Sequence, residues 1–109
     1  MIEVIWKAGE HHNVMEIRGH ANYARHGEDI VCAGVSAIAY ALIGHLQNHT
    51  ELLDVPCIEP GDLVIHARAN GQTGPAFEMA FTGFMMIAEQ YPQYVDCKYM
   101  PYLAADTRN

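Results

Sequence analysis

Residues 19–48 read GHANYARHGEDIVCAGVSAIAYALIGHLQN and lead from the end of a predicted strand, through a polar loop, into a long apolar helix. Asp29 is a favourable N-cap, because its carboxylate can accept N–H groups of the first helical turn. Behind it, apolar residues recur at helical spacing as far as about Asn48. The stripe predicted to face a sheet consists of Val31, Val35, Ile38 and Leu42.

Strands are predicted on both sides of this helix from alternation of apolar and polar residues. Residues 2–8 and 14–18 alternate in this way, with residues 9–13 as a hairpin loop between them. After the helix, residues 52–58 and 63–68 are predicted strands, and Pro56 favours an edge position for the first of these. The segment Glu59-Pro60-Gly61-Asp62 between them is typical of a tight turn.

A second helix is predicted over residues 75–91 and a last strand over residues 95–99. The predicted order is β-β-α-β-β-α-β. It indicates an α+β fold in which two helices pack on one face of a mixed or antiparallel sheet. Residues 1–101 are expected to form one domain, and residues 102–109 a poorly ordered tail. The second helix has more apolar surface than one face needs, which favours contact with the first helix or a homodimer.

The charge balance argues against nucleic acid as a direct partner. Thirteen acidic and six basic residues give a net charge of −7, whereas phosphate binding needs a basic face. The negative charge suits a cationic partner, although solubility alone also explains it. No apolar run approaches the ~20 residues of a membrane span, and the N-terminus lacks a signal-peptide pattern. We therefore expect a cytoplasmic protein that does not bind membranes.

Cys32 and His20 suggest a nucleophile and its base. Cys32 lies just inside the predicted helix, where the positive end of the helix dipole stabilises a thiolate over a thiol. His20 precedes it by a loop that can bring the imidazole back to accept the thiol proton. The pair alone is weak support for catalysis, because a free cysteine near a helix start is usually inert. The other two cysteines, Cys57 and Cys97, lie within predicted strands.

Several further residues are candidates for this site. Tyr23, Arg25 and His26 could contact a substrate, and Gly19 and Gly27 bracket their loop. Asp29 has two possible roles, either as the helix cap or as the residue that orients His20. Ser36 lies one helical turn beyond Cys32 and either hydrogen-bonds near the thiol or bonds back to a helix carbonyl.

Metal binding is not the favoured interpretation of the histidines. His11 and His12 are adjacent in a predicted turn, and neighbouring side chains point in opposite directions. His45 and His49 have the spacing of a helical chelate, but near a helix C-terminus such residues more often face solvent or interact with the dipole. No C-x-x-C pair suggests a structural zinc. We expect neither a metal nor an organic cofactor.

The residues around Cys32 resemble the signature of a known family. Gly19-His20-Ala21, Gly27, the segment Asp29-Ile30-Val31-Cys32-Ala33, and Val35-Ser36-Ala37 are similar to the motif of the ribosomal-processing cysteine proteases, the Prp family. The resemblance implies that His20 and Cys32 are the catalytic dyad and that Gly19, Asp29 and Ser36 support it. Gly34 and Ile38 stand where Ala and Leu are more usual.

The resemblance also implies a substrate and a cellular setting. Family members are bacterial or phage-encoded endopeptidases that act as cytoplasmic homodimers. They remove an N-terminal extension from a large-subunit ribosomal protein, or process phage structural proteins, after a hydrophobic run that ends in an aromatic residue. The acidic surface suits a basic ribosomal N-terminus. Neither the cleavage sequence nor the choice between host and phage substrate follows from the residues.

Two other functions are compatible with the same residues. A non-catalytic module could hold a peptide or ribosomal-protein terminus without cutting it. A thiol redox sensor could use Cys32 reversibly. Replacing Cys32 by alanine separates cleavage from binding, and mild peroxide tests the redox alternative.

Overall fold

The computed structural model describes residues 1–25, 27–49, 58–59 and 61–101. Its elements run in the order β1 (Ile2–Ala8), β2 (His12–Gly19), α1 (Ile30–Asn48), β3 (Ile58–Glu59), β4 (Asp62–Arg68), α2 (Thr73–Gln90) and β5 (Val95–Pro101). This is the predicted α+β order. The predicted third strand falls mostly on residues 52–57, which lie outside the described residues, as does the predicted tail, 102–109.

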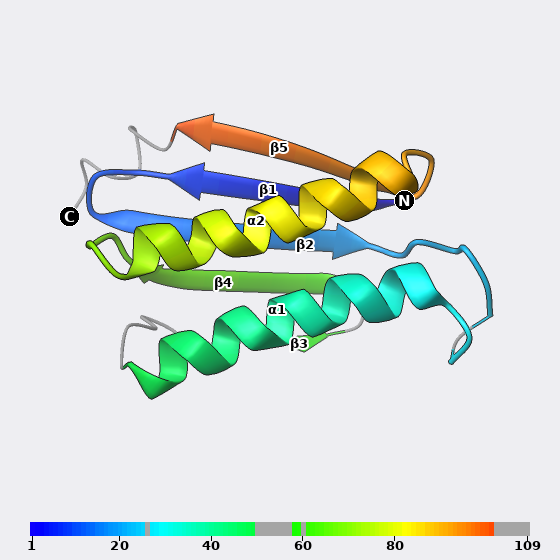
Figure 1. The fold of residues 1–109 in the computed structure, drawn as a ribbon, viewed down its shortest axis with the longest axis horizontal. Coiled ribbons are helices and arrows are strands. Elements are labelled where there is room, and N and C mark those ends of the chain that lie inside the picture. Colours follow the sequence, from blue (N-terminus) through cyan, green and yellow to red (C-terminus); the bar gives the residue numbers. More distant parts are fainter. Residues whose placement is uncertain (26, 50–57, 60, 102–109) are drawn as a thin grey trace.

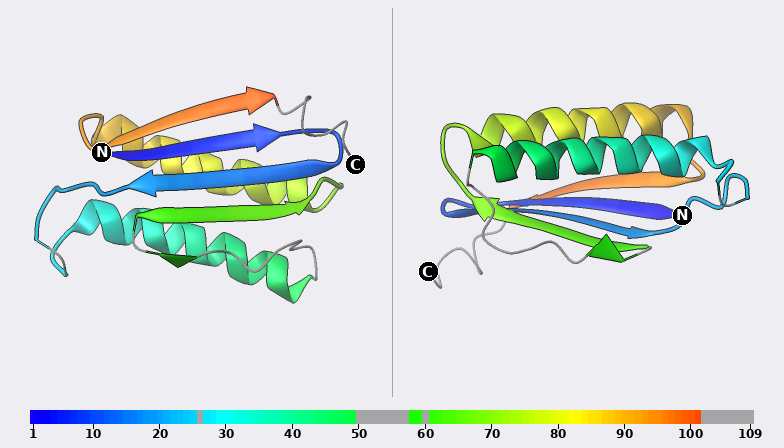
Figure 2. Two further views of the ribbon diagram at one scale, coloured as in Figure 1. Left: turned by 180° about the vertical axis from the view of Figure 1, so that it is seen from behind. Right: turned by 90° about the horizontal axis from the view of Figure 1, so that it is seen from below.

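Within the described residues, one sheet of five strands has the order β3-β4-β2-β1-β5. Strands β1 and β5 are parallel, and the remaining neighbours are antiparallel. Both helices lie on the same side of the sheet, as the edge-on view in Figure 2 shows, and they run in opposite directions across it in Figure 1. The same view shows that α1 begins at the end of the molecule where β2 ends.

The core lies between this helical layer and the sheet. Met15, Ile65, Phe77 and Phe84 are completely buried there. The sheet-facing row of α1 is Val31, Val35, Ala39, Leu42, Ile43 and Leu46. Ile38, predicted to belong to this row, is only partly buried and lies against Gly83 of α2. A Cβ atom at Gly83 would lie 2.9 Å from Cδ1 of Ile38, so the end of that side chain would have to shift, and glycine allows the two helices to pack closely without this shift.

The strand β2 begins earlier than predicted. His12 and Asn13 were expected in the hairpin loop, but both belong to β2. Asn13 is buried, and its Oδ1 accepts a hydrogen bond from Trp6 Nε1 over 3.0 Å. A side-chain hydrogen bond of this kind gives the partly buried indole N–H an acceptor. Strand β2 therefore includes His12 and Asn13, two residues whose polarity had suggested a loop.

The helix α1 has the length and composition of a membrane span, contrary to the expectation that no apolar segment approaches one. Its mean hydropathy is 1.6 over an 18-residue window. Its buried row belongs to the described hydrophobic core, and 33% of this window is buried.

Candidate active site

Cys32 lies in the first turn of α1, and Asp29 fixes that turn. The backbone of Asp29 is extended, and its Oδ1 accepts the N–H of Cys32 over 2.9 Å. Burial by itself would raise the pKa of the Asp29 carboxyl, but the N–H groups of Cys32, Tyr23, Ala24 and Val31 lower it overall. The predicted capping role is confirmed.

The same carboxylate also holds the loop that carries His20. Asp29 Oδ2 accepts the N–H of Tyr23 over 3.0 Å and that of Ala24 over 3.4 Å. Both oxygens of Asp29 are therefore engaged by backbone amides. In the part of the chain that the structure describes, Asp29 makes no hydrogen bond to His20, so the geometry gives no support for its second predicted role.

Tyr23 anchors the middle of this loop. Its ring meets Tyr91 and Tyr94 edge-on, with centroid separations of 5.4 and 5.1 Å. These two tyrosines belong to the turn between α2 and β5, where Tyr94 N donates to Tyr91 O. Tyr23 remains 41% exposed, so a contact with substrate stays a prediction. Sequence reasoning missed Tyr91 and Tyr94, because nothing local to them indicates that the loop returns to that turn.

Two predicted loop glycines have positive φ angles. Gly19 has φ +95°, and a Cβ there would collide with the carbonyl oxygen of Met1. Gly19 is therefore required where β2 leaves the sheet beside β1. Gly27 has φ +89° with open space around it, so only its backbone conformation favours glycine. Arg25 is exposed and pairs with Glu28 at 3.2 Å, and His26 lies outside the described residues.

His20 and Cys32 line one small pocket. Its volume is about 290 Å³, and its walls are His20, Ala21, Asn22, Ala24, Gly27, Asp29, Cys32, Ala33 and Ser36. The pocket brings together the predicted nucleophile, base, cap and serine. Tyr23 and Arg25 do not line it. His20 is exposed and Cys32 is partly buried with a free thiol, so both remain reachable from solvent.

Cys97 provides a contrast to Cys32. It is partly buried in β5 and packs against the core. Burial, together with the charge of Asp96, raises the pKa of its thiol to about 11. A thiol with so high a pKa is protonated at neutral pH and is a poor nucleophile. This supports the prediction that Cys97 is a structural residue. Cys57 lies outside the described residues.

Two pairs of histidines lie outside the lining of this pocket, and within each pair the two rings are in contact. His12 Nδ1 and His66 Nε2 are 2.6 Å apart across β2 and β4, and the rings of His45 and His49 are 4.6 Å apart in the last turn of α1. Among the described residues, no group of three or more His, Cys, Asp or Glu side chains is arranged to hold a metal ion.

The chain is similar to a known family of proteases over most of its length. The model of the family described as cysteine protease Prp matches residues 1–96. The ribosomal processing cysteine protease Prp of Bacillus subtilis strain 168 is 44% identical over 43 residues. This alignment spans 37% of the present chain and 38% of the length of that relative.

Solved structures show the same fold. The Staphylococcus aureus protease Prp with a covalently linked product peptide superposes with a TM-score of 0.76 at 22% identity, covering 91% of this chain and 99% of that one. A Streptococcus mutans protein superposes with a TM-score of 0.73 at 24% identity, covering 93% and 95%. The S. aureus protease with a substrate peptide gives 0.65 at 20% identity, covering 91% and 99%. Because the family model spans nearly the whole chain, this protein belongs to the cysteine protease Prp family.

Proposed function

We propose that this protein is a cysteine endopeptidase that removes the N-terminal extension of a large-subunit ribosomal protein, with Cys32 as nucleophile and His20 as general base. The observation that carries the proposal is the shared pocket of about 290 Å³, in which the Cys32 thiol and the His20 imidazole lie together with the N-cap of α1. Membership of the Prp family supplies the class of reaction.

The proposed reaction begins with proton transfer from the Cys32 thiol to His20. The thiolate attacks the scissile carbonyl carbon, and the C–N bond breaks as His20 returns the proton to the leaving amine. Water then hydrolyses the thioester and releases the N-terminal fragment. The first turn of α1 assists because its N–H groups and positive dipole end favour negative charge on sulfur and on the carbonyl oxygen.

Peptide recognition is proposed to use the loop between Gly19 and Asp29. Tyr23 and Asp29 hold this loop against two separate elements, so a peptide in the pocket would meet an anchored wall. The net charge of −7 favours approach of a basic ribosomal segment. The S. aureus relatives were solved with a substrate peptide and with a covalently linked product peptide, which is consistent with such binding here. A phage structural protein is the alternative substrate.

A cytoplasmic homodimer is part of the same proposal. Large apolar side chains of α2 face away from the sheet: Met79 is 76% exposed and Met86 is 59% exposed. Apolar surface of this kind on a helix is what a second copy would cover. Sedimentation velocity at micromolar concentration tests this, with Met79→Lys as the variant expected to give monomers.

The decisive test of function is incubation with a peptide that contains the N-terminal extension and the first residues of the ribosomal protein, followed by mass spectrometry. Cleavage after the aromatic end of the hydrophobic run is expected under reducing conditions. The Cys32→Ala variant should still bind the peptide but leave it intact. Binding without cleavage by the wild type would favour the non-catalytic module, and loss of binding after mild peroxide would favour the redox sensor.

A further inference from the structure

The imidazole of His20 lies directly against Gly61, at the start of β4. A Cβ atom built on Gly61 would lie 2.5 Å from His20 Nε2, 3.0 Å from Cε1 and 3.2 Å from Cδ2. A Cβ atom is essentially never found within 3.0 Å of another heavy atom, so a side chain at position 61 would require the His20 ring to move from its place. The contact joins a turn and a loop that are 41 residues apart in the sequence.

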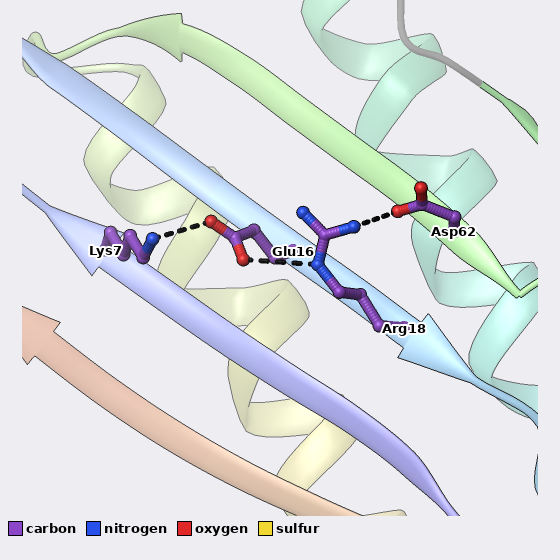
Figure 3. Close-up of polar contacts among 4 residues, drawn as sticks. All are labelled: Lys7, Glu16, Arg18 and Asp62. Carbon is purple, nitrogen blue, oxygen red and sulfur yellow. Dashed lines mark hydrogen bonds and ion pairs between the residues drawn. The ribbon is translucent and has the colours of Figure 1, made fainter.

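The backbones on the two sides of this contact are fastened together. Gly19 N, directly before His20, donates to Gly61 O over 2.9 Å. The adjacent residues Arg18 and Asp62, one position further into the sheet, form an ion pair across β2 and β4. Figure 3 shows this ion pair as one end of a charged row that continues through Glu16 to Lys7. Gly61 is therefore held at a fixed place relative to the backbone of His20.

We propose that Gly61 is a positioning residue for His20: the absence of a side chain leaves a space, the seat, that the imidazole occupies in the wall of the pocket that His20 shares with Cys32. The catalytic meaning of this seat rests on the proposed function, whereas the contact itself does not. A side chain at position 61 would displace the ring from the pocket that it shares with Cys32, while leaving the thiol and its helix untouched.

The backbone conformation at Gly61 also favours glycine. The experiment must therefore separate this effect from the displacement of the His20 ring. Its φ is +79°, a conformation that disfavours most side chains. Asparagine tolerates this region several-fold better than alanine, but it brings the same Cβ atom. Gly61→Ala combines backbone strain with displacement of the ring, whereas Gly61→Asn keeps the displacement and relieves much of the strain.

The test compares the wild type, Gly61→Ala and Gly61→Asn in peptide cleavage and in thermal unfolding. Both variants should lose about 10- to 100-fold in kcat, the loss expected when a catalytic group moves by about 1 Å, with KM changed less than about threefold. The melting temperature should fall more for alanine than for asparagine. If Gly61→Asn retains the kcat of the wild type, only the backbone conformation matters and the seat is refuted.

A second readout does not depend on catalysis. The NMR resonance of the His20 ring Cε1–H can be assigned by its loss in His20→Gln, and it should shift in Gly61→Asn. The corresponding resonance of His66, which lies further along β4, is the control and should not shift. An unmoved His20 resonance overturns the proposal, even if the alanine variant does not fold. If the wild type cleaves no peptide but the resonance shifts, the contact stands and the proposed function fails.

Discussion

The two ends of the helical layer contain two very different pockets. The start of α1 borders the small pocket of about 290 Å³ with His20, Cys32 and Asp29. Near the end of α1, a larger and mainly apolar pocket of about 730 Å³ lies between the helices and includes His45, His49 and Met79. Active sites often occupy the largest apolar pocket of a protein, which would favour the larger pocket here. The smaller pocket is the better candidate because it combines a free thiol, an imidazole and a fixed helix N-terminus.

If the smaller pocket is the active site, removal of the Cys32 sulfur should have the largest effect on peptide cleavage. Cys32→Ser is expected to reduce kcat/KM for the peptide by at least about 1,000-fold, because the hydroxyl is a far weaker nucleophile than a thiolate. Cys97→Ala is the matched control, because this thiol has a pKa raised to about 11 and lies outside the pocket. Equal losses in both variants would mean that the loss is not specific to Cys32 and would contradict its assignment as the nucleophile.

Loss of the imidazole should have the next largest effect. His20→Gln is expected to lower kcat about 100- to 10,000-fold, the range of a general base, while the melting temperature changes little because His20 is exposed. His45→Gln, in the larger pocket, should leave kcat within about twofold of the wild type. A greater loss of kcat in His45→Gln than in His20→Gln would move the active site to the other end of the layer.

The sequence was most informative where structure is local. The strand over residues 2–8, the long helix that ends at Asn48 and the N-cap at Asp29 are all observed, although buried and exposed residues alternate only over residues 2–4 of that strand. The strand order, the edge-on contacts of Tyr23 with Tyr91 and Tyr94, and the seat at Gly61 were not predictable. They join segments far apart in the chain, and the local sequence only marked Gly61 as part of a turn.

A smaller effect is expected from the cap that joins the loop to the helix. Asp29→Ala should reduce the free energy of unfolding by about 1 kcal/mol, the usual value of an N-cap. It should also reduce kcat/KM, because Tyr23 and Ala24 lose their common acceptor. Asp29→Asn retains a capping oxygen and should lie between the wild type and the alanine variant in chemical denaturation. An unchanged stability in Asp29→Ala would argue against the cap.

The cap also predicts a pH dependence. The pKa of Asp29 is lower in the folded protein than its ordinary value of 3.8, so its ionised form stabilises the fold. This contribution is complete above the unfolded pKa and is lost as the pH falls through the folded value. The stability difference between the wild type and Asp29→Asn should therefore narrow below about pH 4 and stay constant near pH 7. A difference that grew on acidification would contradict this sign.

The most direct test of the central claim is to detect the covalent intermediate. Wild-type protein mixed with the peptide and quenched in acid within one turnover should gain the mass of the N-terminal fragment less one water, as a thioester requires, and digestion should place the adduct on Cys32. The adduct should accumulate much more slowly in His20→Gln. A cleaved peptide without any adduct on Cys32, or an adduct on another residue, would contradict the assignment of Cys32 as the nucleophile.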